Sequence, residues 1–305
     1  MKLSIELAVL GLVSLPGVTA WGPLGHQTAA YVATYFVSNS TAAYFKDLLD
    51  NKNDDYLASI AVFADDIKDD PEGKFTKNFH FIDAHDKPYK DCNVDYERDC
   101  KKDGCVISAL TNYTKQAIDR ELPEEDRRFA VKLLVHFIGD LHQPLHNEDV
   151  GQGGTKIWVK WQSERRTLHS VWDSAIPEEM AEHLNERRKR PTLAWALEWA
   201  SELSDEISNG KFASERDSWL KSFDLSDPLK TAMHWSNEAN DIVCSNVFYE
   251  HYGPEEIKHK ELSNDYYDQA APVVEKQIAR AGYRMAAWLN EIARNKWGGE
   301  SNGEL

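Results

Sequence analysis

The chain has 305 residues and a formal net charge of −16, from 51 acidic and 35 basic residues. This balance excludes the usual basis of non-specific nucleic-acid binding, in which Lys and Arg neutralise phosphates, unless another component supplies positive charge. The plain alternative is that the acidity keeps a secreted protein in solution. No run after the leader approaches the roughly 20 apolar residues of a membrane span, so we expect no stable membrane association.

Residues 1–20 predict a signal peptide. Lys2 precedes an apolar run, and the small residues Val18 and Ala20 match a signal peptidase site. Cleavage there makes Trp21 the first residue of a secreted, extracellular protein. We expect residues 21–305 to form one domain, because no Pro/Gly/Ser-rich linker divides them, and nothing indicates more than a monomer.

Apolar residues at helical spacing predict a mainly α fold. The strongest helix is predicted at Asp126–Leu141, where the apolar face is wide. Further helices are predicted at Gln27–Ser38, Tyr56–Ile67, Ser108–Arg120, Thr192–Asn209, Pro228–Val247 and Ala270–Arg294. Strand-like alternation occurs at Lys156–Trp161, after a Gly-rich turn, and predicts a short β-hairpin.

Four cysteines in an exported chain indicate two disulfides, with three possible pairings. They are Cys92, Cys100, Cys105 and Cys244. The short separation of Cys100 and Cys105 favours a small local loop. The segment from Cys92 to Cys105 is rich in Asp, Asn and Gly, and we expect it to be irregular.

Two further features concern modification. The triplets that begin at Asn39 and Asn112 are acceptors for N-linked glycans. The basic run from Glu186 to Arg190 is either a processing site or anion patch, or else a solvated helix surface, which is the usual role of a charge run of this length.

Histidine and aspartate occur four residues apart at two places. His136 and Asp140 lie on the strongest predicted helix, and His169 and Asp173 lie in "LHSVWD". At this spacing both side chains project from one helical face about a turn apart, as metal chelation requires. For one such pair alone, a core histidine beside a capping or surface aspartate is the ordinary alternative.

Further histidines and aspartates near these pairs favour a metal site: His80, Asp65, Asp66, His142 and His146. Imidazole and carboxylate are ligands that zinc prefers. Pro144 is expected to end the helix and to carry His146 round a turn, where it can serve a second metal. His142 lies on a different helical face from Asp140, and we interpret it as structural.

The new amino terminus is a further candidate ligand. The free amine of Trp21 and its own carbonyl oxygen can form a five-membered chelate, and His26 is near enough in sequence to complete it. Removal of the leader would then be part of site assembly, because any preceding residue converts the amine into an amide. The alternative is that Trp21 anchors the terminus in the core.

Five motifs occur in one order along the chain: Trp21-Gly22-x-x-Gly25-His26, "ADDIK", "HFIDA", "HFIGDLHQPLH" and "LHSVWD". Together with "NVDYERDC" and "AGYRMAAWLNEIA" they resemble the fungal and plant single-strand-specific zinc nucleases of the S-one/P-one type, which are related to bacterial zinc phospholipases C. The resemblance covers essentially the whole mature chain. It implies a single helical domain with three zinc ions in a cleft, which hydrolyses single-stranded DNA and RNA to 5′-phosphate products and acts on 3′-nucleotides.

The resemblance also implies the ligands of each zinc ion. The first ion takes Asp65, His80, His136 and Asp140. The second takes the Trp21 amine and carbonyl, His26 and the bridging Asp140. The third takes His146, His169 and Asp173. By spacing alone Asp66 is as good a candidate as Asp65, so only the resemblance selects between them.

Other roles follow from the resemblance in the same way. It implies the disulfides Cys92–Cys244 and Cys100–Cys105, and it gives Phe81 a base-stacking role and Asp83 a base-reading role. From the sequence alone, Phe81 can equally pack beneath His80, and Asp83 can accept a hydrogen bond from a ligating histidine.

The implied metals change the meaning of the negative charge. Three zinc ions carry six positive charges against three ligand carboxylates, so the inner site has a net charge of +3 and can take the role that basic residues play elsewhere. In the implied reaction Asp65 orients the attacking water and Lys68 adds positive charge beside the phosphate.

Three positions depart from the family pattern. Phe63 stands where the family often has Trp, and Thr155 stands where it commonly has Asn, so Thr155 is assigned no role. Lys68 stands where some relatives carry Arg, which replaces a planar donor with a point charge.

Two other functions remain as alternatives. A zinc phospholipase C would use a similar site, although no obvious membrane-insertion loop is present. A non-catalytic secreted metal-binding protein would hold zinc without turnover.

Overall fold

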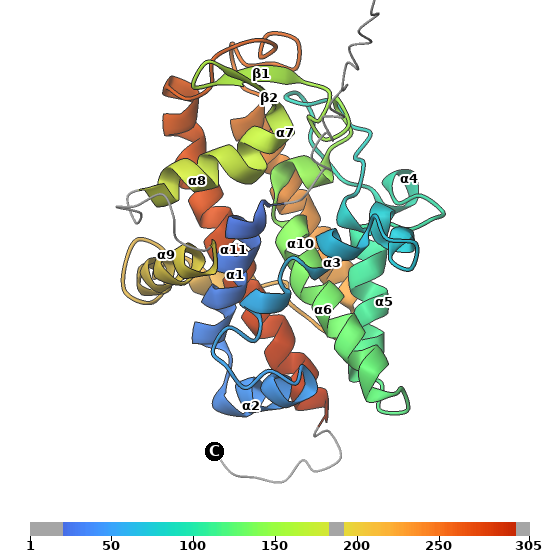
Figure 1. Ribbon diagram of the computed structural model, residues 1–305. Helices are drawn as coiled ribbons and strands as arrows, with labels where there is room; N and C mark the ends of the chain where they lie inside the picture. Colours follow the sequence, from blue (N-terminus) through green and yellow to red (C-terminus); the bar gives the residue numbers. More distant parts are fainter. Residues whose placement is uncertain (1–20, 183–191, 297–305) are drawn as a thin grey trace, which may run out of the picture.

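The computed structural model describes residues 21–182 and 192–296 (Figure 1). The predicted signal peptide and the basic run Glu186–Arg190 lie outside these residues. The longer helices are α1 (Pro23–Phe36), α2 (Asn39–Leu48), α5 (Val106–Ile118), α6 (Glu124–Leu141), α9 (Thr192–Ser208), α10 (Pro228–Ile242) and α11 (Asp265–Lys296). The short α-helices are α3 (Phe63–Ile67), α4 (Tyr96–Asp99), α7 (Leu168–Ser170) and α8 (Ile176–Ala181).

Short 3₁₀ and π turns connect these helices. The 3₁₀ segments are η1 (Ala58–Ile60), η2 (Lys74–His80), η3 (Pro144–Asn147) and η6 (Arg216–Leu220), and the π turns are η4 (Val171–Ala175) and η7 (Val243–Val247). The mainly α prediction is therefore confirmed. None of the helices among the described residues combines the length and the apolar character needed to cross a membrane.

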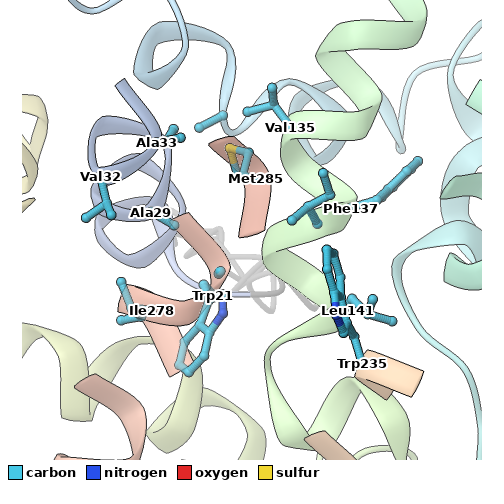
Figure 2. Packing of buried hydrophobic residues seen from close by; sticks show 14 of the residues in the cluster. Trp21, Ala29, Val32, Ala33, Val135, Phe137, Leu141, Trp235, Ile278 and Met285 are labelled. Atoms are coloured by element: carbon cyan, nitrogen blue, oxygen red, sulfur yellow. The ribbon is translucent and has the colours of Figure 1, made fainter. Parts of the chain in front are cut away.

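Helices α1 and α11 run side by side through the centre, with α9 packed on α1, while α5 and α6 pair beside them (Figure 1). Figure 2 shows buried residues of α1, α6 and α11 in one cluster, which includes Trp21. Gly282 permits the close approach of α11 to α1, because a Cβ there would lie 2.5 Å from Val32 Cβ. The site residues of α1 and α6 therefore project from a tightly packed frame.

The predicted β-hairpin is present. Strand β1 (Trp158–Trp161) pairs antiparallel with β2 (Glu164–Thr167). Val159 and Trp161 are buried and alternate with exposed or half-buried neighbours, which explains the alternation seen in the sequence.

Most predicted helices agree with the structure to within a few residues, but the helix predicted at Tyr56–Ile67 is wrong. The structure has the short η1 and α3 there, separated near Ala61. The carbonyl oxygen of Ala61 accepts a hydrogen bond from His136 Nδ1 at 2.7 Å. This long-range contact takes the place of a helical hydrogen bond and sets α3 apart, with Asp65 on it.

Two short regions differ from the sequence analysis. Helix α2 was not predicted, although its first residues are the glycan acceptor triplet at Asn39, and the Ser38 side chain caps it by accepting from Thr41 N at 3.1 Å. The irregular segment between Cys92 and Cys105 contains the short helix α4, which the Asp95 side chain caps.

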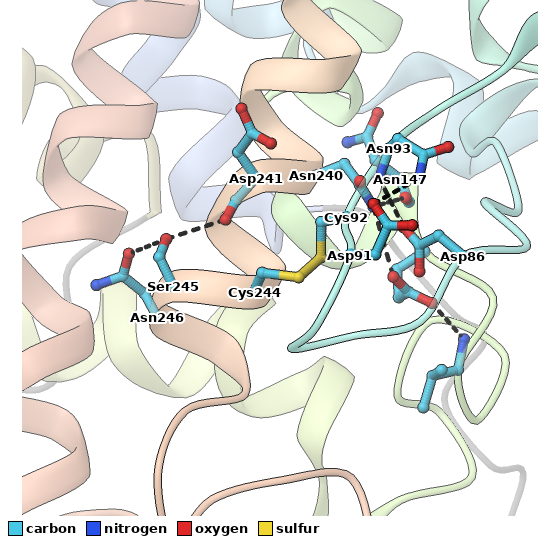
Figure 3. The surroundings of a disulfide bond; sticks show 12 residues. Asp86, Asp91, Cys92, Asn93, Asn147, Asn240, Asp241, Cys244, Ser245 and Asn246 are labelled. Atoms are coloured by element: carbon cyan, nitrogen blue, oxygen red, sulfur yellow. Dashed lines mark hydrogen bonds between the residues drawn. A yellow bond between two sulfur atoms is a disulfide. The ribbon is translucent and has the colours of Figure 1, made fainter.

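Both disulfides implied by the resemblance are present. Cys92–Cys244 joins residues 152 positions apart and ties the loop before α4 to the π turn η7 after α10 (Figure 3). Cys100–Cys105 closes a loop between α4 and α5.

Candidate metal centre

Asp140 lies at the centre of a buried cluster of histidines. Its Oδ1 is 3.2 Å from His26 Nε2, and its Oδ2 is 3.0 Å from His80 Nδ1 and 3.3 Å from His136 Nε2. Asp65 Oδ1 lies 3.8 Å from both His80 Nδ1 and His136 Nε2. Helices α1, α3 and α6 and the end of η2 thus bring five of the predicted ligands together.

Backbone contacts orient these rings. His136 Nδ1 donates its proton to the carbonyl oxygen of Ala61, which only accepts, so Nε2 faces Asp140 and is the nitrogen that is unprotonated in the neutral ring. The rings of His26 and His136 stack with their centroids 4.1 Å apart. The nitrogen of His136 that can bind a metal therefore already points into the cluster.

A second cluster contains His146, His169 and Asp173. His146 Nε2 lies 3.3 Å from His169 Nε2, which lies 2.9 Å from Asp173 Oδ2. His146 Nδ1 donates to the carbonyl oxygen of His80, and His169 Nδ1 donates to that of Gly153, each at 2.6 Å. Both Nε2 atoms therefore face the carboxylate, and His80 links the two clusters.

Local backbone structure explains these positions. Helix α6 ends at Leu141, and Pro144 begins η3, which carries His146 round a turn as predicted. His169 lies on α7 but Asp173 lies on the π turn η4, where the sequence predicted an ordinary α spacing. Gly153 has a φ of +57°, and a Cβ there would lie 2.6 Å from the Leu145 carbonyl oxygen, so glycine suits this turn.

The first cluster fits a bound cation. Both ring nitrogens of His26, Nε2 of His80 and both carboxylate oxygens of Asp140 are buried without a hydrogen-bond partner of good geometry. Buried polar atoms are normally paired, because leaving them unpaired costs free energy. Imidazole nitrogens and carboxylate oxygens are the ligands of zinc sites, so a metal ion that took one ring nitrogen of each histidine and the Asp140 oxygens would satisfy several of these atoms.

Protonation of a histidine is the other way to compensate the negative charge of the carboxylates in this cluster. In the metal-free protein, burial alone would lower the pKa of His136, but the Asp140 and Asp65 charges raise that pKa to about 9. The same carboxylates therefore attract either a proton or a metal ion, and metal binding must release protons.

The two clusters lie against a cavity of about 500 Å³. His80, His146 and His169 line it, together with Phe81 and Asp83. The cavity thus joins potential metal ligands to an aromatic side chain and a carboxylate, as a site for an unstacked nucleotide would require.

The chain matches the S1/P1 Nuclease family over residues 21–294. It belongs to this family. It is 42% identical to Nuclease S1 of Aspergillus oryzae over 291 residues, which cover 95% of this chain and 97% of the relative. It is 41% identical to Nuclease P1 of Penicillium citrinum over 272 residues (89% and 97%), and 32% identical to Endonuclease 3 of Arabidopsis thaliana over 283 residues (90% of each).

Membership of the S1/P1 nuclease family confirms the resemblance found in the sequence and makes the chain a nuclease. The choice of Asp65 over Asp66 agrees with the geometry, because Asp65 belongs to the histidine cluster while Asp66 is exposed. Lys68 Nζ lies 2.6 Å from Asp65 Oδ1, and both side chains are only 9% exposed. Burial alone would raise the pKa of Asp65, but the charges of His136 and Lys68 lower it.

Phe81 and Asp83 have defined surroundings, and their roles toward substrate stay predictions. Phe81 is half-buried and is not part of the core cluster, and Phe137 packs edge-on against His80 instead, with ring centroids 5.3 Å apart. Asp83 forms an ion pair with Lys101.

Trp21 is fully buried in the core, as the anchoring alternative expects. The next residue, Gly22, donates its backbone N–H to the carbonyl oxygen of Asp173 at 2.8 Å, and a Cβ there would lie 2.4 Å from Ser174 Oγ. The segment entering α1 is thereby held against the second cluster. Ligation by the Trp21 amine stays a prediction.

The structure also shows the surroundings of three other residues that the sequence analysis named. His142 Nδ1 donates to the Ile138 carbonyl oxygen at 2.7 Å, and its Nε2 accepts from Arg284, which agrees with a structural role. Asn39 and Asn112 are exposed on α2 and α5, so both glycan acceptors are accessible.

Sequence reasoning missed two side chains at the site. Gln143 donates to Asp173 Oδ1, and Lys101 pairs with Asp83. Gln143 lies inside "GDLHQPLH" and Lys101 inside the short cysteine loop, but neither residue has a spacing that reveals its partner, because each contact closes a loop of the fold.

Proposed function

We propose that this chain is a secreted zinc endonuclease that hydrolyses phosphodiester bonds of single-stranded DNA and RNA to 5′-phosphate products, and that it also removes phosphate from 3′-nucleotides. Residues 1–20 are removed as a signal peptide, and 21–305 form one domain. The observation that carries the proposal is the convergence of two His/Asp clusters on one cavity in a member of a nuclease family.

Three zinc ions are proposed, with ligands divided as the resemblance implies. The first would be held by Asp65, His80, His136 and Asp140, the second by the Trp21 amine and carbonyl, His26 and Asp140, and the third by His146, His169 and Asp173. Zinc in such sites lowers the pKa of bound water and polarises phosphoryl oxygens.

Two side chains of the protein, Asp65 and Lys68, would act on the water and the phosphate. Asp65 is oriented by Lys68 and faces the cluster, so its carboxylate can orient the water that attacks phosphorus in line. The Lys68 ammonium lines the cavity and contributes positive charge beside the phosphate.

Preference for single strands follows from Phe81. An aromatic face in the cavity can stack on a base, which contributes about 1–3 kcal/mol per base and tolerates every sequence. A base inside a duplex is already stacked on its neighbours, so it cannot use this face without being extruded.

The test compares single-stranded and duplex DNA after incubation of the mature protein with zinc, with the chain ends assayed between pH 4 and 8. We expect single strands to be cut to 5′-phosphate ends and the rate to vanish with chelator. His136→Ala should abolish cutting, whereas His251→Ala, at an exposed histidine, serves as the matched control. Intact single strands at every pH would reject the proposal.

The two alternatives make different predictions. Release of phosphocholine or diacylglycerol from lipid vesicles, with DNA untouched, would favour a phospholipase C. Zinc binding without turnover on either substrate would favour a non-catalytic metal-binding protein.

A further inference from the structure

We propose that Lys101 determines the base tolerance of the cavity: by pairing with Asp83 it lets one site accept all four nucleobases. This inference rests on the proposed function, in which Phe81 stacks on a base and Asp83 contacts its edge.

Three side chains that line the cavity carry the argument. Phe81, Asp83 and Lys101 all line it, and Lys101 Nζ contacts Asp83 Oδ2. The Asp83 side chain is 14% exposed and that of Lys101 is 60% exposed, so the pair is open to a ligand on the lysine side. Asp149 lines the same cavity, but its carboxylate pairs with His85 at 3.1 Å.

The backbone around Lys101 is fixed relative to Asp83. The Cys100–Cys105 disulfide closes the loop that carries the lysine. The carboxylate of Asp99, which is 1% exposed, accepts from His85 N at 3.1 Å, two residues after Asp83 in the chain. The ion pair therefore joins two backbone segments that are each anchored, although the Lys101 side chain itself is exposed.

The pair offers a donor beside an acceptor. An ionised carboxylate only accepts hydrogen bonds, and an ammonium only donates them. Because Oδ2 of Asp83 is engaged by Lys101, Oδ1 remains to accept one N–H, and the ammonium beside it can donate.

Every nucleobase can match this arrangement. On the Watson–Crick edge an N–H donor lies next to an acceptor in each base: N6–H and N1 in adenine, N1–H and O6 in guanine, N4–H and N3 in cytosine, and N3–H and O4 in thymine and uracil. One ion pair is therefore complementary to all of them.

Removal of the ammonium would change this match. Both oxygens of Asp83 would then be free, and guanine is the base with two adjacent donors, N1–H and N2–H, for a bidentate contact. The other bases would place an acceptor against a carboxylate oxygen, which is unfavourable. A good bidentate contact gives a discrimination of about 5- to 150-fold against the wrong base.

Lys101→Met tests the proposal, because methionine keeps an apolar stem of similar length and lacks the charge. Lys102→Met, at the exposed neighbouring lysine of the same loop, is the matched control, and Lys101→Arg should retain the donor. The substrates are four dinucleotides that differ only in the base of the 5′ nucleoside, whose 3′ phosphate is cut. Bis(p-nitrophenyl) phosphate, which has no base, reports the metal site separately.

We expect Lys101→Met to raise the kcat/KM ratio of guanine over each other base by about 5- to 150-fold, mainly through KM, with unchanged hydrolysis of the base-free substrate. The Lys102→Met and Lys101→Arg ratios should stay near that of the wild type. A ratio that changes less than about twofold in Lys101→Met, or that changes equally in Lys102→Met, overturns the inference. Inactivity of the zinc-loaded wild type on every substrate would instead overturn the proposed function and this inference with it.

Discussion

Gly139→Ala is a small change that should damage the proposed metal centre. Gly139 lies on α6 between two proposed ligands, and a Cβ there would be 2.6 Å from His26 Nδ1 and 2.9 Å from its Cε1. The His26 ring cannot move away freely, because it is buried and stacked on His136. Glycine at this position therefore lets His26 reach Asp140.

Two opposing effects determine how much Gly139→Ala changes the free energy of unfolding. In a helix interior, alanine is more stable than glycine by about 0.5–1 kcal/mol. Overpacking of a well-packed site costs about 1–3 kcal/mol. The difference is a net destabilisation of the metal-free Gly139→Ala protein of up to about 2.5 kcal/mol, and we expect the displaced His26 to lower the zinc content and the nuclease rate.

The double variant with His26→Ala provides the internal control. Without the imidazole the clash is gone, so Gly139→Ala should stabilise that background by about 0.5–1 kcal/mol, a reversal of sign. Urea unfolding of the chelator-treated variants, with zinc counted by elemental analysis after reloading, gives both readouts. Equal stabilisation in the two backgrounds, or full zinc and an undiminished rate in Gly139→Ala, would refute the reasoning.

Three further predictions concern the terminus, the phosphate contact and the long disulfide. One residue added before Trp21 in the mature protein should lower zinc content and rate, since the amine becomes an amide; full zinc with an unchanged rate would show that the amine does not ligate. Lys68→Ala should lower kcat by about 10²- to 10³-fold with the zinc content unchanged, and Lys68→Arg should lower kcat by a smaller factor. A kcat of Lys68→Ala equal to that of the wild type would show that Lys68 does not stabilise the phosphate. Replacing Cys92 and Cys244 by serine should lower the free energy of unfolding in urea by about 5 kcal/mol, and loss of the short disulfide should lower it by about 2 kcal/mol, because the longer loop restricts the unfolded chain more. The reverse order would contradict this reasoning.

Helical periodicity was enough to predict α6 and the pairing of His136 with Asp140. The helix follows from contacts between residues three or four positions apart, and the two side chains lie four residues apart on it. It failed at Tyr56–Ile67, where a contact from His136 to Ala61 across the fold replaces local hydrogen bonding. No local pattern could have predicted that contact.

The same distinction holds within the candidate site. Spacing favoured a local loop at Cys100 and Cys105 but left three pairings possible, and the family resemblance gave the full pairing that the structure shows. The contact between Lys101 and Asp83 spans 18 residues and depends on where the cysteine loop folds back, so neither periodicity nor the motifs revealed it.

The central claim is that scattered imidazoles and carboxylates gather several cations within an acidic protein. Anomalous diffraction at the zinc edge from crystals of the mature protein tests it most directly. The account predicts three peaks, two of them flanking Asp140 and the third among His146, His169 and Asp173. Catalytically active crystals with no zinc peak at Asp140 would contradict it.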